Sequence, residues 1–405
     1  MKKLLLPLLM TLGLLTGCVA PEMKLRVKLD ETTPIKVAAM LPLTGKNHIY
    51  AEQMREGLLL AESEINANGG INNRKLQLEI IDTCGTAVGT RAAIDKAIAL
   101  NTVAIIAGYD TQEVGMIIGN AAALRMPTVI PLATSDYHVQ ESPFVYRNCY
   151  SDAQQMEVLA AYLHHWRNLK RGALLTDPVG DINYSRSVCR DLEQSMKDNG
   201  DMVVFKDSLP ADGSLPEKLI RDMLACDPQF IFVPSGGKRI ATILKALRKA
   251  GFNGVICGPD SWDDPEFIAA LVDTEPGDCI YTAFFSKEND SAEYERFSAE
   301  FRKKYLHLPD ACSTQSYDAL KFLAIGLSGA DNLYKFDKNW RTIRNHIGAA
   351  AIYTMLKKGD IDRTVYLNSI GVHRGKRLIP YARLSKKLQY SKIKDYQITE
   401  SPEKL

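Results

Sequence analysis

Short apolar runs alternate with amphipathic segments of helical period along most of the chain. Nine runs have the length and composition of buried strands: residues 35–43, 75–82, 103–108, 127–132, 172–177, 202–207, 230–237, 254–260 and 279–285. Between them, apolar residues recur every three to four positions over residues 51–67, 89–101, 114–124, 153–169 and 185–199. Strands separated by amphipathic helices are typical of βαβ units. The pattern predicts an α/β fold with parallel sheets that are covered on both faces.

The first residues have the pattern of an export signal. Two lysines precede an apolar run over 4–15, which is too short for an ordinary membrane span. The run ends in the motif LTGC, which resembles the lipobox of bacterial lipoproteins, in which the cysteine is acylated. We therefore expect a signal peptide over 1–18, a lipid anchor on Cys18 and a polar tether over 19–34. A plain secretion signal, or cleavage at Ala20, is the alternative.

Composition narrows the classes of partner and cofactor. Charged residues make up 24% of the chain and the formal net charge is +2, with no basic tract that interleaves aromatics. A nucleic-acid partner is therefore not expected. Apart from Cys18, seven cysteines are scattered singly, so neither a metal site nor another cofactor is expected. Cys257 and Cys279 end and begin neighbouring apolar runs; they either pair or serve as small buried residues.

The residues that follow each strand are the candidates for a binding site. In an open α/β sheet, ligands bind beyond the carboxyl ends of the strands. Those positions are residues 42–45, 108–112, 132–135, 177–180, 234–237 and 258–262. They supply hydroxyls, amides, an aromatic ring and a carboxylate, but no G-x-S-x-G motif and no complete phosphate-binding loop. The pattern favours ligand binding over catalysis, and no catalytic residue is assigned.

The stretch CGPDSWDD, residues 257–264, concentrates three carboxylates and a tryptophan after one strand. Asp263 and Asp264 precede a proline and a glutamate, which is the pattern of a helix N-terminus. Asp260 lies at the strand tip, where it would face a ligand. Trp262 is interpreted either as an apolar wall of the site or as core packing.

Several segments together resemble the leucine/isoleucine/valine-binding type of ABC-transporter substrate-binding proteins. The first of these segments runs from IKVAAMLPLTG to LQLEIIDT. The likeness continues in AIIAG, PTVIPLATS, GALLTD, GPDSWDD and SYDALKFLAIGL, and covers roughly residues 35–380. The resemblance implies the type I periplasmic-binding-protein fold, two Rossmann-like lobes joined by three hinge crossings.

Each lobe is then discontinuous in sequence. The expected divisions are 35–151 with 284–364 for lobe 1, 152–283 with 365–384 for lobe 2, and 385–405 for a C-terminal tail.

The resemblance assigns roles to four residues of the first lobe. Tyr50 matches the family's cleft tyrosine, and Thr134 matches a hydroxyl that receives a ligand carboxylate with nearby amides. Leu132 would contribute only its main chain. Gln112 stands where the family usually has a serine that helps to hold the carboxylate, a change that narrows this end of the site.

Four residues of the second lobe complete the set. Tyr184 matches the family's second-lobe tyrosine, and Asp260 stands where an acid pairs with an α-ammonium group. Gly236 replaces an aromatic residue that branched-chain amino-acid binders can carry. Trp262 and the two tyrosines would supply apolar walls or a cation–π face.

The resemblance implies a monomeric, extracytoplasmic binding lipoprotein that captures a small amino acid or related amphoteric solute by hinge closure and delivers it to an ABC permease. Two alternatives remain open. One is a sensory or regulatory lipoprotein of the same fold that modulates an envelope enzyme or receptor, and the other is an envelope hydrolase. Neighbouring permease genes would favour transport, and turnover of an ester, amide or glycoside would favour hydrolysis.

Overall fold

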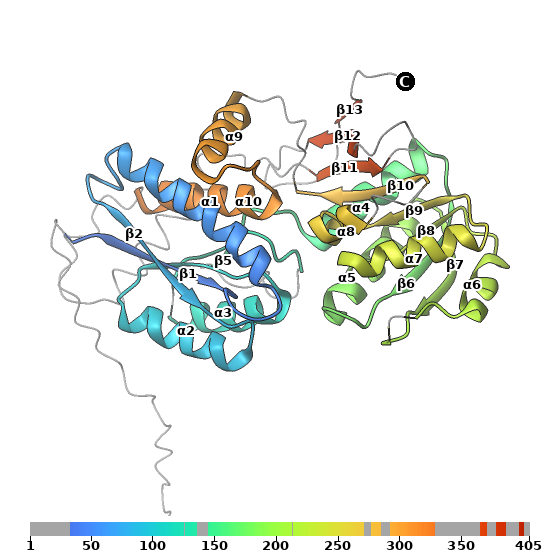
Figure 1. The fold of residues 1–405 in the computed structure, drawn as a ribbon, viewed down its shortest axis with the longest axis horizontal. Helices are drawn as coiled ribbons and strands as arrows, with labels where there is room; N and C mark the ends of the chain where they lie inside the picture. The colour runs from blue at the N-terminus through green and yellow to red at the C-terminus, as the bar shows by residue number, and fades with distance from the viewer. Residues whose placement is uncertain are drawn as a thin grey trace, which may run out of the picture.

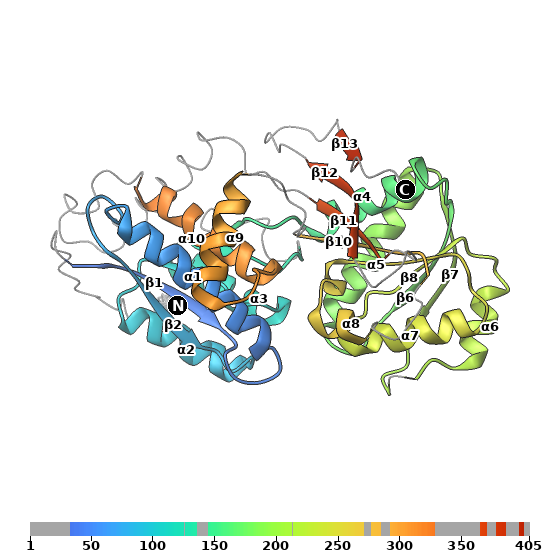
Figure 2. The same cartoon turned by 45° about the horizontal axis from the view of Figure 1, so that its top comes forward.

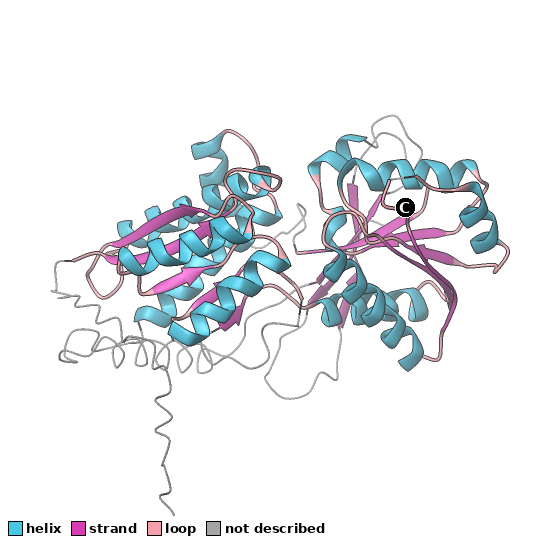
Figure 3. Cartoon of the chain, turned by 90° about the horizontal axis from the view of Figure 1, so that it is seen from below, coloured by secondary structure: helices cyan, strands magenta, loops and turns pink. Residues whose placement is uncertain are grey.

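The molecule consists of two α/β lobes, each with a sheet that carries helices on both faces (Figures 1 and 3). The computed structural model describes residues 33–124, 126–135, 145–212, 214–270, 277–284, 292–328, 365–370, 378–385 and 397–400. The predicted fold class is confirmed. The signal peptide, Cys18 and most of the tether lie outside the described residues.

The sheet of lobe 1 is built from five parallel strands in the order β2-β1-β3-β4-β5. They are β1 (Ile35–Leu41), β2 (Leu76–Asp82), β3 (Ala104–Ile106), β4 (Thr128–Ile130) and β5 (Val145–Arg147). The flanking helices are α1 (His48–Ala67), α2 (Ala87–Ala99) and α3 (Thr111–Leu124). Side chains of β1 alternate between faces, with Val37, Ala39 and Leu41 in one core and Ala38 and Met40 in another. This alternation buries both faces of the sheet.

Two helices from much later in the chain complete lobe 1. They are α9 (Ala292–Tyr305) and α10 (Ala311–Ser328), and both lie against α1 (Figure 2). The half-buried Glu64 of α1 accepts a hydrogen bond from the Tyr317 hydroxyl at 2.5 Å and one from Lys321 Nζ at 3.1 Å. Arg296 Nη1 lies 3.5 Å from the same carboxylate oxygen. Polar contacts therefore join two distant segments of the sequence.

Lobe 2 has an eight-stranded sheet in the order β13-β12-β11-β10-β9-β8-β6-β7. Its parallel strands are β6 (Arg171–Thr176), β7 (Met202–Ser208), β8 (Phe230–Phe232), β9 (Val255–Gly258) and β10 (Cys279–Ala283). Its helices are α4 (Asp152–His165), α5 (Ile182–Asp198), α6 (Glu217–Leu224), α7 (Gly237–Lys249) and α8 (Pro265–Ala270).

The expected parallel sheet has an antiparallel extension in lobe 2. Its three strands are β11 (Val365–Ile370), β12 (Leu378–Ser385) and β13 (Gln397–Glu400). They follow one another along the edge next to β10, so neighbouring strands run in opposite directions and need no crossover helix. Residues 397–400 belong to the segment that we expected to be a tail, and they pair with β12.

Cys257 and Cys279 are both buried. They sit on adjacent strands, but Cys257 packs with Phe232 on one face of the sheet and Cys279 packs with Ile231 on the other. Side chains on opposite faces of a sheet cannot form a disulfide. The sequence left open whether these cysteines pair or serve as small buried residues; the structure supports the second interpretation.

The chain first passes between the lobes after β5, through residues 148–151. There the Ser151 hydroxyl accepts from the Gln154 amide at 3.2 Å while Gln154 Oε1 accepts from the Ser151 amide at 3.0 Å, a capping box that starts α4. The other two predicted crossings, after β10 and between α10 and β11, involve residues outside the described ranges. None of the helices in the described part of the chain has the length and apolar character needed to cross a bilayer.

The Glu64 cluster predicts a stability difference. Replacing Glu64 by Gln removes the charge that Lys321 and Arg296 contact, so the free energy of unfolding should fall by about 1 kcal/mol at pH 7. Glu300→Gln is the matched control, since its contact with Lys303 is long, 3.9 Å, and exposed. Urea denaturation of both variants tests this, and equal effects would contradict it.

Candidate functional site

The carboxyl ends of the parallel strands in both lobes carry side chains that meet between the lobes. We call this set the inter-lobe site and define it as Tyr50, Tyr109 and Thr134 of lobe 1 with Tyr184, Asp260 and Asp264 of lobe 2.

Two tyrosines form the lobe 1 wall of this site. Tyr50 lies in the first turn of α1, and Tyr109 follows β3. Their rings are parallel, with centroids 4.5 Å apart. Burial raises the pKa of Tyr109 well above its usual value, and the nearby acids Asp260 and Asp264 of lobe 2 raise it further. The stacked pair therefore faces the acidic loop of the other lobe.

Asp260 is the centre of the lobe 2 side. It begins a single 3-10 turn after β9, and its Oδ1 accepts from the Tyr184 hydroxyl at 2.5 Å and from Gln155 Nε2 at 2.8 Å. Burial raises the pKa of this carboxyl to about 6, although the two hydrogen bonds oppose the shift. The structure thus brings together Tyr184 and Asp260, two residues to which the resemblance assigns roles.

Gln155 is a contact that sequence reasoning missed. Its side chain is fully buried in the first turns of α4, where Oε1 accepts from Thr282 Oγ1 at 2.6 Å and from the Asp260 amide at 3.2 Å. Its Nε2 also donates to Asp152 Oδ1 at 3.2 Å. A glutamine in an amphipathic helix usually faces solvent, so the sequence carried no signal for this role.

Thr134 connects lobe 1 to the same network. Its carbonyl accepts from the Asp152 amide at 2.9 Å and from Arg147 Nη1 at 2.8 Å. Burial raises the pKa of Asp152 to about 7, against the opposing effect of the Thr134 hydroxyl. A chain of buried polar groups therefore runs from Thr134 through Asp152 and Gln155 to Asp260.

The other two lobe 1 candidates lie apart from this network. Leu132 is buried in a hydrophobic core, which agrees with a main-chain role only. Gln112 is exposed in the first turn of α3.

Asp264 joins the lobes directly. We predicted it as a helix N-cap, and its Oδ1 does accept from the Glu266 amide at 2.6 Å and from the Phe267 amide at 3.3 Å. Its Oδ2 accepts a hydrogen bond from the Tyr50 hydroxyl of lobe 1. Because a carboxylate has two oxygens, one residue can cap α8 and contact the opposite lobe.

Trp262 does not line the site. Its side chain is fully buried in the core of lobe 2, near Phe267 and Tyr281, and its Nε1 donates to the Val233 carbonyl at 2.8 Å. A Cβ on Gly258 would overlap its ring, so a glycine is needed there. The wall interpretation is therefore wrong in this structure, and core packing accounts for the tryptophan.

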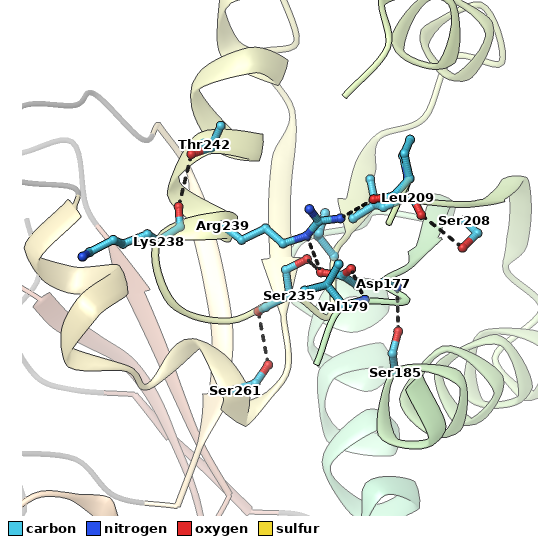
Figure 4. Close-up of polar contacts among 12 residues, drawn as sticks. Asp177, Val179, Ser185, Ser208, Leu209, Ser235, Lys238, Arg239, Thr242 and Ser261 are labelled. Atoms are coloured by element: carbon cyan, nitrogen blue, oxygen red, sulfur yellow. Dashed lines mark hydrogen bonds and ion pairs between the residues drawn. The ribbon is translucent and has the colours of Figure 1, made fainter. Parts of the chain in front are cut away.

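Gly236 is exposed in the loop before α7, and a buried ion pair holds that loop (Figure 4). Asp177 accepts from Arg239 Nε at 2.8 Å and from the Ser235 hydroxyl. Ser261 Oγ donates to the Ser235 carbonyl at 3.3 Å, which ties this loop to the one that carries Asp260. Arg239, in the first turn of α7, is therefore paired with a carboxylate of the same lobe.

Metal binding has no support in this region. Among the described residues, no group of three His, Cys, Asp or Glu side chains is arranged to hold an ion.

The buried Asp260 carboxyl should make the empty protein less stable as pH rises. Its folded pKa of about 6 lies above its ordinary value of 3.8, so the unfolded state releases the proton first and the stability falls between about pH 4 and pH 6. Asp260→Asn should therefore raise the Tm at pH 8, and the gain should shrink towards pH 4. Differential scanning fluorimetry across that range measures it.

Asp212→Asn is the control for this experiment. Asp212 is exposed, and the Ser214 side chain and amide lower its pKa, so the variant should show no gain at pH 8. A similar Tm increase in both variants, or none for Asp260→Asn, would contradict the assignment.

Comparison with known proteins identifies the family. A family model described as periplasmic binding protein matches residues 34–358. A Leu/Ile/Val-binding protein of Rhizobium johnstonii is 25% identical over 303 residues, which is 73% of this chain and 79% of the relative.

Solved structures show the same fold at low sequence identity. A branched-chain amino-acid transporter binding protein of Streptococcus pneumoniae, in complex with isoleucine, has a TM-score of 0.68 at 19% identity; the match covers 91% of this chain and 100% of that one. A solute-binding protein of an ABC transporter from R. palustris, in complex with benzoate, has a TM-score of 0.69 at 16% identity, with 87% and 96% covered. The chain therefore belongs to the periplasmic binding protein family, type I and Leu/Ile/Val-binding-like, whose members bind solutes and are not enzymes.

Proposed function

We propose that this chain captures a small ammonium-bearing solute, of the size of an amino acid, and delivers it to an ABC permease. The observation that supports the proposal most strongly is the environment of the Asp260 carboxyl. This carboxyl is enclosed by Tyr184 and Gln155 on its own lobe and lies opposite the stacked tyrosines of lobe 1. The relatives named as Leu/Ile/Val-binding proteins support the class of solute.

Physical chemistry favours a cationic group at this position. A buried carboxylate is costly unless a charge or several donors compensate it, and the pKa of about 6 shows that the two protein donors do so only in part. An ammonium group would complete the compensation through a charge-assisted hydrogen bond. The parallel rings of Tyr50 and Tyr109 offer an apolar wall or a cation–π face beside it.

The contact between Tyr50 and Asp264 supports capture by closure of the lobes. It joins the first turn of α1 to the loop before α8, so it depends on the approach of the two lobes. A ligand held between Asp260 and the tyrosines would favour the same approach. The permease would then recognise the closed arrangement, whose population the ligand increases.

Export with a lipid anchor on Cys18 is part of the proposal. Its support is the sequence alone, namely the apolar run over 4–15 and the LTGC motif. We expect the wild-type chain, expressed in a bacterium that processes lipoproteins, to enter the detergent phase on Triton X-114 partitioning. Cys18→Ser should remain uncleaved and unlipidated, as intact mass spectrometry would show. Wild-type chain in the aqueous phase would contradict the anchor.

Ligand screening tests the binding role. A ligand that binds only the native state raises Tm, so a thermal-shift screen of amino acids, amides, amines and aromatic acids should find at least one stabilising solute. Asp260→Ala should lose that shift, because the charged partner is gone, while the empty variant melts no lower than wild type. Asp222→Ala is the control and should keep the shift, because the half-buried Asp222 lies on α6, where it pairs with Lys218.

Unchanged affinity in Asp260→Ala would contradict the ammonium assignment. A shift given only by aromatic acids, as for the benzoate-binding relative, would contradict the solute class.

A further inference from the structure

We infer that the inter-lobe site takes a cation that carries no free carboxylate, such as an amine, amidine or guanidine, in preference to an amino acid. This inference rests on the proposed function and narrows its solute class. It is based on the acidic side chains of lobe 1, which lie where a ligand carboxylate would otherwise bind.

The N-terminus of α3 is the place in lobe 1 where a ligand carboxylate would gain most. Free amides and the positive end of the helix dipole attract anions there, and α3 begins two residues after Tyr109. In this chain, Asp110 Oδ1 accepts from the Glu113 amide at 2.8 Å. The Asn47 side chain donates to the other oxygen of Asp110 at 3.2 Å. The chain thus already places a carboxylate of its own at this helix end, on one of its free amides.

Glu113 adds a second acid to the same turn. It is buried, with 4% of the residue exposed, and its Oε2 accepts from the Tyr109 amide at 3.4 Å. Burial raises the pKa of Glu113 to about 7, and the neighbouring Asp110 contributes to the rise. A ligand carboxylate at this turn would therefore lie beside two acidic side chains. It could not bind the amides of Tyr109 and Glu113, which already donate to those side chains.

Thr134 is also unsuited to receive an anion. The amide of the fully buried Asp152 donates to the Thr134 carbonyl at 2.9 Å, so another acidic residue of the chain lies beside this position. A ligand carboxylate at Thr134 would be repelled by that acid when it is ionised.

The positive charges within these networks are directed inward. Arg147 donates to the carbonyls of Thr134 and Ser135 at 2.8 and 2.6 Å. Arg239 donates to Asp177 and to the Pro210 carbonyl. By contrast, Asp264 raises the pKa of both stacked tyrosines, and Asp260 raises the pKa of Tyr109. The electrostatic balance therefore favours a ligand with net positive charge.

Matched pairs of solutes test this directly. Each pair is an amino acid and the amine left when its carboxylate is removed: leucine and isoamylamine, phenylalanine and phenethylamine, ornithine and putrescine, arginine and agmatine. Calorimetric titration of the full-length processed protein gives Kd for each member. In every pair that binds, we expect the amine to bind at least roughly tenfold more tightly.

A variant tests the cause of the preference. Asp110→Asn keeps a good helix N-cap and removes one charge, so the preference for the amine should shrink by roughly tenfold. Asp222→Asn removes a charge on α6 that pairs with Lys218 and does not belong to the inter-lobe site, so it should leave the preference unchanged.

Three outcomes would overturn the inference. The first is an amino acid that binds as tightly as its amine. The second is a preference that Asp110→Asn does not alter. The third is the absence of binding by any of the four amines, even at about 10 mM. If an amino acid binds at least as tightly as its amine and Asp260→Ala abolishes that binding, the proposed function stands while this inference fails.

Discussion

Burial of the Asp260 carboxyl is the constraint around which the second lobe is arranged. A carboxyl group withdrawn from water must be hydrogen-bonded, and the chain supplies Tyr184 from α5 and Gln155 from α4. Gln155 in turn needs Thr282 and Asp152, and Asp152 contacts Thr134 of lobe 1. The position of one acid thus requires the hinge segment, two helices and a strand of lobe 2 to keep a common geometry.

Much of the fold follows from short-range patterns. The nine apolar runs all contain strands. The central strands are buried on both faces and therefore read as continuous hydrophobic sequence, whereas β7 is a largely exposed edge strand. Strand β5 was not predicted because its sequence, VYR, is not a continuous apolar run like those of the equally short β3 and β8. The antiparallel strands β11–β13 escaped because their order is set by pairing along the sheet edge, and no local sequence feature encodes that pairing.

The sequence suggested site residues mainly through the family resemblance. It assigned roles to Tyr50, Thr134 and Tyr184, whereas Asp260 was also indicated by its place at a strand tip. Gln155 and Tyr109 were not, since their roles come from packing between segments far apart in the chain. The sequence left the role of Trp262 open because a large aromatic residue after a strand can point to either side. Its ring packs over Gly258, where a larger residue would not fit, and it therefore lies in the core.

The raised pKa of Asp260 couples the binding of a cation to the release of a proton. Around pH 6 the empty carboxyl is partly protonated, because burial disfavours its charge. A cation that docks against it favours the ionised form and expels the proton to solvent. The site then exchanges a proton for the cationic ligand. The net charge of the filled site therefore differs from that of the empty site by less than the charge of the ligand. For a cationic ligand, a membrane component would have to distinguish the two states mainly by the relative position of the lobes.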